Sequence, residues 1–124
     1  MASEFSGTAM SLVMGIRLMA CCVAARHDPL VELSRQMESI TAAKAVMDFA
    51  QACSRAWAEN VMVSRPCCHA LTPDEAVIAQ MAQTARNADR EGFDRLLDGL
   101  IRRERHDRLY LLTQETVVAI SSGP

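Results

Sequence analysis

Two cysteines and a histidine stand next to one another in the middle of the chain, at Cys67, Cys68 and His69. Thiolate and imidazole are ligands that zinc prefers, and an accessible thiolate is also the group that redox sensors use. Free cysteine is, in addition, among the most buried residue types, so these thiols could simply pack at the end of a helical bundle. The sequence leaves metal binding, redox sensing and packing open.

The spacing of the cysteines bears on the zinc hypothesis. Zinc-binding cysteines usually come in pairs with about two to four residues between them, and the chain contains no C-x-x-C pair. Further ligands would have to come from Cys21, Cys22 or Cys53. We interpret those three as core residues, because they lie in apolar runs with helical spacing. Zinc is therefore a candidate cofactor only at Cys67, Cys68 and His69.

The clearest structural signal in the chain directly follows this cluster. Thr72 is a typical N-cap residue, Pro73 is suited to the first helical position, and Glu75 lies three residues after the cap. This arrangement predicts a capping box, in which Glu75 accepts a hydrogen bond from the backbone of Thr72. The cysteine cluster is thus expected in a connector that leads into a helix.

Composition predicts an all-α protein with a single domain over residues 1–124. Residues 1–7 of this range are expected to form a loose N-terminal lead-in. Half of the residues are hydrophobic, and aromatic residues make up only 4%. Alanine, leucine and methionine dominate, and all three favour helices. A chain of 124 residues can build one ordinary core but not two. We expect one compact bundle of five or six helices.

The pattern of caps and apolar residues predicts where these helices lie. The first is expected over 8–26, and Asp28-Pro29 is a second start signal. The segment 29–60 could form one long helix or two with a break near Ser39, with Asn60 as its end. The chain then continues with the helix after Thr72 up to about residue 87, a shorter helix over 93–101, a charged connector and a final helix over 109–120.

The segment that follows Pro66-Cys67-Cys68 also resembles a known pattern. It is similar to a small uncharacterised all-helical family of alphaproteobacteria, whose members carry a Cys-Cys stretch, then Thr-x-Asp-Glu, then two helices. The matching residues here are Pro66-Cys67-Cys68 and Thr72-Pro73-Asp74-Glu75. This family has no known activity, so the resemblance implies a bacterial protein with a helical fold and no particular chemistry.

Residues 8–26 form the most apolar part of the chain, and several of the eight methionines lie within it or on other apolar faces. Arg17 falls inside this run, and a charge at the centre of a membrane span costs about 2.5–3.5 kcal/mol. No positive leader precedes the run, as a secretory signal would require. We therefore expect a cytoplasmic protein with no membrane partner. The helix over residues 8–26 should be covered on most sides, either by the bundle or by a second subunit. The second case predicts self-association through residues 8–26.

Charge and motifs argue against several other classes. The net charge of −2 gives no global attraction for nucleic acid. Four arginines near the C-terminus could contact phosphate; they are Arg102, Arg103, Arg105 and Arg108. Glu104 and Asp107 interrupt this run, which favours a solvated connector. No catalytic motif occurs. We expect a non-enzymatic protein-interaction or regulatory module that acts as a homodimer; the alternative is a metal-binding or thiol-redox regulator.

Overall fold

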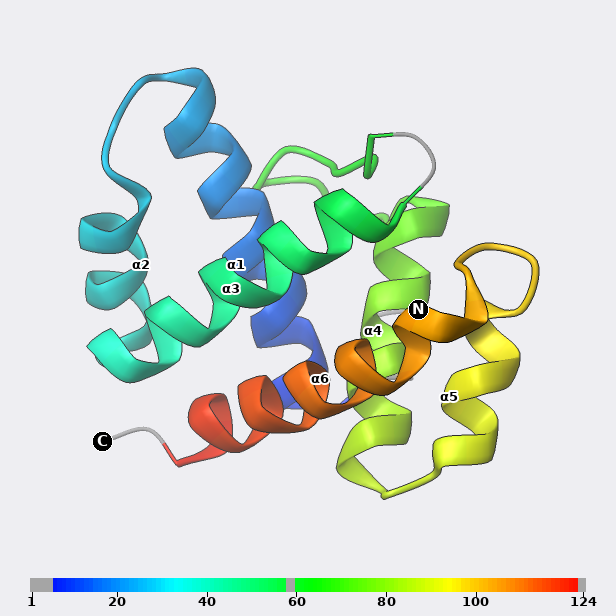
Figure 1. Ribbon diagram of the computed structural model, residues 1–124. Helices are drawn as coiled ribbons and strands as arrows, with labels where there is room; N and C mark the ends of the chain where they lie inside the picture. Colours follow the sequence, from blue (N-terminus) through cyan, green and yellow to red (C-terminus); the bar gives the residue numbers. More distant parts are fainter. Residues whose placement is uncertain (1–5, 58–59, 123–124) are drawn as a thin grey trace.

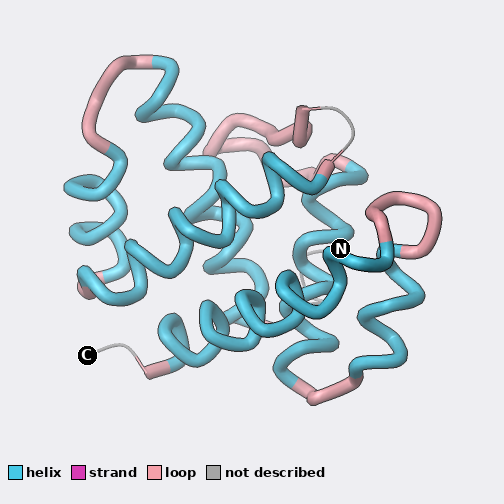
Figure 2. Tube along the Cα trace, viewed as in Figure 1, coloured by secondary structure: helices cyan, strands magenta, loops and turns pink. Residues whose placement is uncertain are grey.

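The computed structural model describes residues 6–57 and 60–122, and this part of the chain folds into a bundle of six α-helices (Figure 1). The all-α prediction is confirmed: these residues form helices and loops and no strand (Figure 2). The elements, in chain order, are α1 (Gly7–Ala24), α2 (Pro29–Met37), α3 (Ile40–Ala56), α4 (Pro73–Arg86), α5 (Arg90–Leu97), the short 3₁₀ helix η2 (Arg103–Arg105) and α6 (His106–Ser121).

Side-chain caps set the starts of the first five α-helices, and the cap of α4 is Thr72. The side chains of Ser6, Asp28, Ser39 and Asp89 accept hydrogen bonds from backbone N–H groups in the first turns of α1, α2, α3 and α5. Such caps satisfy donors that have no partner within the helix. The structure therefore corrects the expected lead-in over 1–7, because Ser6 already caps α1 and Gly7 belongs to it; residues 1–5 lie outside the described part.

The predicted segment 29–60 is two helices. α2 ends at Met37, because Glu38 adopts the left-handed conformation with φ of 55°, and Ser39 starts α3 as its N-cap. The expected end at Asn60 is wrong, since α3 stops at Ala56 and Trp57 has an extended backbone. The shorter helix also differs from expectation: α5 covers Arg90–Leu97 instead of 93–101, and the charged connector holds η2 and the start of α6.

The core lies where α1, α3, α4 and α6 pack against one another. Its largest apolar side chains are fully buried and come from all parts of the chain: Leu12, Leu33, Phe49, Ile78, Met81, Phe93 and Leu97. α4 and α5 form a hairpin that packs against one end of α6, and α2 covers the opposite end of the bundle (Figure 1). The final helix, expected over 109–120, begins three residues earlier and covers His106–Ser121.

α1 is the one helix in the described ranges that is long and apolar enough to cross a membrane, with a mean hydropathy of 1.7 over its 18 residues. In the fold it contacts α2, α3, α4 and α6. Only seven of its residues are buried, so the expectation of burial on most sides overstates what the bundle provides. Its second half, from Leu18 to Ala24, contributes a single buried residue, Cys22. The predicted helix over 8–26 is also two residues too long at its C-terminal end.

Candidate functional site

The charged residue inside the apolar helix α1 forms a buried ion pair. The Arg17 side chain is 2% exposed and the Glu75 side chain is 1% exposed. Nε of Arg17 lies 2.7 Å from Oε2 of Glu75, and Nη2 lies 2.8 Å from Oε1, so the guanidinium binds the carboxylate with two parallel hydrogen bonds. This pair ties α1 to the first turn of α4.

The same pair organises the loop that carries the cysteines. Besides Arg17, the Glu75 carboxylate accepts hydrogen bonds from the backbone N–H groups of Ser64 and Thr72, each at 2.9 Å. Arg17 in turn donates to the carbonyl oxygens of Cys68 at 2.7 Å and Ala70 at 2.9 Å. Both charged groups have their hydrogen-bonding capacity used, which is the condition under which a buried pair is tolerated. The loop over residues 60–72 is therefore held from its inner side.

The pKa values of the pair follow from this geometry. Burial by itself would raise the pKa of Glu75, but the hydrogen bonds from Arg17, Thr72 and Ser64 and the charge of Arg17 outweigh it, so the pKa lies below its usual value. The hydrogen bond to Glu75 raises the pKa of Arg17, against the lowering effect of burial. Both groups are thus held in their charged forms.

Asp74 fixes the other end of the loop. Its two carboxylate oxygens accept hydrogen bonds from the indole N–H of Trp57 at 3.2 Å and the backbone N–H of Met62 at 2.7 Å. The Thr72 hydroxyl donates to the Met62 carbonyl oxygen at 2.6 Å and accepts from the Glu75 N–H. The predicted capping box at Thr72 and Glu75 is confirmed, and it serves the loop as well as the helix.

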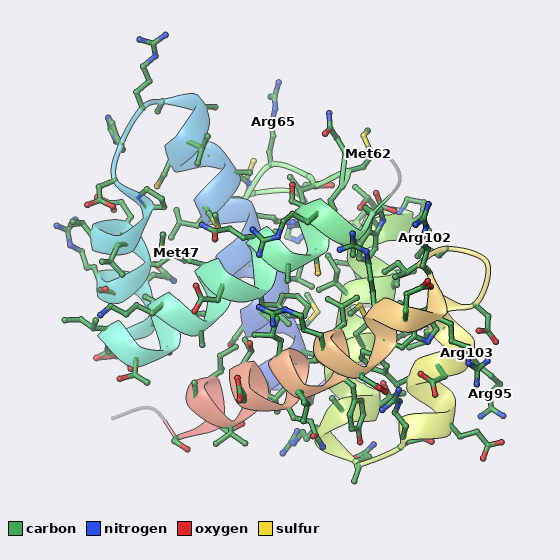
Figure 3. All side chains as sticks on the ribbon, viewed as in Figure 1. Met47, Met62, Arg65, Arg95, Arg102 and Arg103 are labelled. Atoms are coloured by element: carbon green, nitrogen blue, oxygen red, sulfur yellow. The ribbon has the colours of Figure 1, made fainter. Side chains whose placement is uncertain are left out.

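Cys67, Cys68 and His69 lie on the outside of this loop. Residues 65–68 form a turn, closed by a hydrogen bond from the Cys68 N–H to the Arg65 carbonyl oxygen, and all three side chains are exposed. Figure 3 shows the neighbouring Arg65 extending away from the molecule. The packing interpretation of Cys67 and Cys68 is therefore wrong: Arg17 holds the carbonyl of Cys68, so the main chain is fixed while the thiols stay in contact with solvent.

The other cysteines divide between core and surface. Cys22 and Cys53 are buried, as expected, and burial raises the pKa of both thiols. Cys21 is exposed, which corrects the expectation that it belongs to the core. Within residues 6–57 and 60–122, no three histidine, cysteine, aspartate or glutamate side chains are grouped so that they could hold a metal ion. Zinc binding at Cys67, Cys68 and His69 stays a prediction.

An apolar groove runs along the second half of α1. It has a volume of about 570 Å³, and its other walls come from α3, α4 and the loop over residues 60–72. None of the described residues that line it is charged; they are Ile16, Met19, Ala20, Val23, Ala24, Ala50, Cys53, Ser54, Asn60, Val61, Val63 and Ile78. Val23 on its edge is 59% exposed, and Met62, in the loop next to Val61 and Val63, is 65% exposed. We call this feature the apolar groove.

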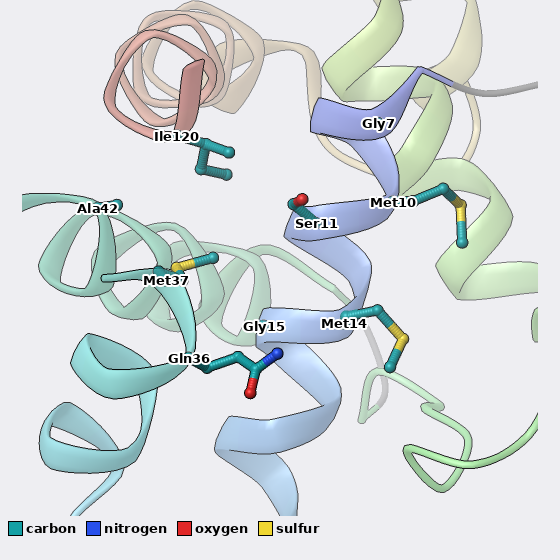
Figure 4. Close-up of a pocket in the computed structure, with 9 residues that line it drawn as sticks. All are labelled: Gly7, Met10, Ser11, Met14, Gly15, Gln36, Met37, Ala42 and Ile120. Atoms are coloured by element: carbon teal, nitrogen blue, oxygen red, sulfur yellow. The ribbon is translucent and has the colours of Figure 1, made fainter. Parts of the chain in front are cut away.

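A second depression, of about 380 Å³, lies between α1, α2, α3 and α6. Figure 4 shows Met37 and Ile120 pointing into it, while Met10 and Met14 point away from it. Its wall on α1 includes Gly15, where an added Cβ would lie 3.1 Å from Met37 Cε and 3.2 Å from Val46 Cγ1. Glycine here lets the three helices approach closely, so this depression reflects helix packing.

The third histidine joins α5 to α6. The His106 ring is 1% exposed; its Nδ1 lies 3.0 Å from Asp94 Oδ1 and its Nε2 lies 3.1 Å from the Ile101 carbonyl oxygen. Arg90 bonds to Asp94 and to Asp107. Burial alone would raise the pKa of Asp94, but hydrogen bonds from Arg90 and His106 lower it. Both ring nitrogens have partners within the fold, so this network ties α5 and the segment after it to α6.

No family model, no curated protein and no solved structure matches the chain. The resemblance to an alphaproteobacterial family stays a prediction.

Proposed function

We propose that the protein is a non-enzymatic interaction module that works as a homodimer, with α1 as the contact helix. The observation that supports this most strongly is the apolar groove, to which α1 contributes five residues: Ile16, Met19, Ala20, Val23 and Ala24. An uncharged surface of this kind is unfavourable in water and is typical of sites that bind a partner. An amphipathic or apolar helix is the usual occupant of such a groove.

A second copy of the chain is the proposed occupant. α1 is the most apolar helix, and its second half is mostly uncovered by its own bundle. In a two-fold dimer the same surface is used by both subunits, so α1 of each copy would lie along the groove of the other. This arrangement covers Val23 in both copies at once. The surface along α1 then receives α1 of the partner and presents its own α1 to the partner, as in isologous interfaces.

The test compares two exposed valines. Val23→Asp places a charge in the apolar groove, whereas Val31→Asp places it on α2, which does not line the groove; the two side chains are 59% and 51% exposed. Size-exclusion chromatography with light scattering at one fixed concentration should give a dimer for the wild type and for Val31→Asp, and a monomer for Val23→Asp. Equal masses for all three proteins would contradict self-association through this face.

A thiol-redox regulator is a second candidate, and the exposure of Cys67 and Cys68 favours it. Both thiols are exposed, on a loop whose main chain Arg17 holds at the Cys68 carbonyl oxygen, so an oxidant in solution can reach them. Adjacent Cα atoms are about 3.8 Å apart, less than the usual span of a disulfide, so the resolving thiol would come from outside the pair. Free thiols of this kind suit the bacterial cytoplasm, where we place the protein.

Oxidised glutathione tests this candidate. Thiolate attack on its disulfide would form a mixed disulfide on Cys67 or Cys68 and release one glutathione thiolate. Mass spectrometry of the intact protein should show the adduct in the wild type and in Cys21→Ser, but not in Cys21→Ser/Cys67→Ser/Cys68→Ser, whose remaining thiols, Cys22 and Cys53, are buried. Elemental analysis of protein purified without chelator tests the metal alternative at the same residues: zinc near one per chain that is lost in Cys67→Ser/Cys68→Ser would support it.

A further inference from the structure

A small depression at the start of α6 brings together three arginines from separate elements. Arg55 lies in the last turn of α3, Arg105 ends η2, and Arg108 lies in the first turn of α6; all three line a space of about 110 Å³. From the sequence, the arginines near the C-terminus formed an interrupted run; the fold adds Arg55, which is distant in the chain. We propose that this depression binds a single phosphate group carried by a small molecule.

The depression has the build of an anion site. Its floor is apolar, with Ala52 7% exposed and Leu109 2% exposed. Arginine side chains can lie along such a floor with their stems and keep the guanidinium groups in water at the rim. The planar guanidinium forks match the oxygens of a phosphate group, with which they form paired hydrogen bonds. Three forks around one space favour a ligand with several equivalent oxygens.

The size of the space limits the ligand. At about 110 Å³ the space is well below the roughly 300 Å³ at which sites that enclose a whole small molecule begin, so it suits one group of a ligand. None of the described residues that line it is aromatic, so they offer no stacking platform for a base. The rest of the ligand would therefore lie outside.

The charges around the depression favour an anion. Its lining carries three arginines and one carboxylate, Glu104, which leaves two positive charges in excess. Within the described part of the chain, none of the three arginines forms an ion pair, whereas Arg90 and Arg95 on α5 do. The carboxylate of Asp107 is engaged by Arg90. Among the described residues that line the depression, Glu104 is the one carboxylate that opposes a phosphate.

Isothermal titration calorimetry with inorganic phosphate and with glycerol phosphate, at low chloride, tests the proposal. Arg55→Gln and Arg108→Gln should each weaken binding by about tenfold, because each removes a charged hydrogen-bond donor. Arg103→Gln is the matched control, since Arg103 lies in the same connector but is not among the residues that line the depression. Glu104→Gln should tighten binding. Unchanged thermal melts would show that these surface variants fold normally.

Three results would overturn the proposal. One is wild-type protein that binds phosphate no more tightly than chloride. Another is an equal loss of affinity in Arg103→Gln and Arg108→Gln, which would reduce the effect to general charge attraction. The third is a single-stranded oligonucleotide that binds more tightly than both phosphate compounds with the same dependence on the arginines. Tighter binding of glycerol phosphate than of free phosphate would identify the ligand as an organic monoester; the reverse order would identify free phosphate.

Discussion

Replacing Arg17 by methionine should destabilise the protein by about 3–5 kcal/mol, since removing one partner of a buried ion pair leaves the other charge without compensation. The contacts of Arg17 explain the size of this loss of stability. Methionine fills much of the volume of the arginine stem but takes away two hydrogen bonds to the Glu75 carboxylate and two to the carbonyl oxygens of Cys68 and Ala70. Glu75 keeps only its two backbone donors, at Ser64 and Thr72. The loss is a large share of the roughly 5–15 kcal/mol that stabilises an ordinary domain.

Urea unfolding, followed by circular dichroism, measures this change. The matched control is Arg35→Met, which removes an arginine from an exposed pair: Arg35 lies 3.5 Å from Glu32 and its side chain is 73% exposed. Surface pairs of this kind contribute little, so the control should change the free energy of unfolding by less than about 0.5 kcal/mol. Equal losses in Arg17→Met and Arg35→Met would refute the reasoning that burial makes the first pair essential.

The partner variant separates the ion pair from the volume of the side chains. Glu75→Gln leaves the Arg17 charge buried without a carboxylate and should also destabilise the protein. The double variant Arg17→Met/Glu75→Gln should lose less than the sum of the two single losses, because no uncompensated charge remains. Strict additivity would show that the two side chains do not interact across the 2.7 Å contact.

Three further predictions follow from the same region. Thr72→Ala should lower the free energy of unfolding by about 1 kcal/mol through loss of the cap, and a change within the scatter of replicate melts would contradict this. In native protein, a thiol reagent should label the three exposed cysteines quickly and the two buried ones only on unfolding; fast labelling of all five would show that the core does not protect them. Because the pKa of Glu75 lies below its usual value in the folded state, its charge stabilises the fold above that usual value, and this stabilisation is lost as the pH falls through the folded pKa. The melting temperature of Glu75→Gln should therefore fall less steeply with acid than that of the wild type.

Local signals in the sequence predict the starts of α2, α3 and α4, because a cap involves only neighbouring residues. Asp28-Pro29, Ser39 and the Thr72 capping box lie where the sequence places them. Helix ends are harder to predict: α3 stops four residues before Asn60, and α5 ends at Leu97 although apolar residues continue to Ile101. Those later residues are buried by packing, so periodicity alone does not distinguish them from helix.

The candidate site depends on contacts that no local pattern contains. Arg17 stands out in the sequence only as a charge within an apolar run, and Glu75 only as part of a cap. A buried arginine needs a partner, so the sequence could have indicated that some carboxylate packs against α1, but not which one. The same holds for Arg55, which the fold brings to the arginines of the C-terminal connector. The exposure of Cys67 and Cys68 likewise follows from Arg17 holding the loop from its inner side.

In the proposed dimer, α1 holds two copies of the chain together through the apolar groove. Sedimentation equilibrium of the wild-type protein over a wide range of dilution tests it most directly. The proposed dimer predicts a mass near twice 13.6 kDa at high concentration that falls towards 13.6 kDa as the protein is diluted through its dissociation constant. A mass of one chain at every concentration would contradict the claim.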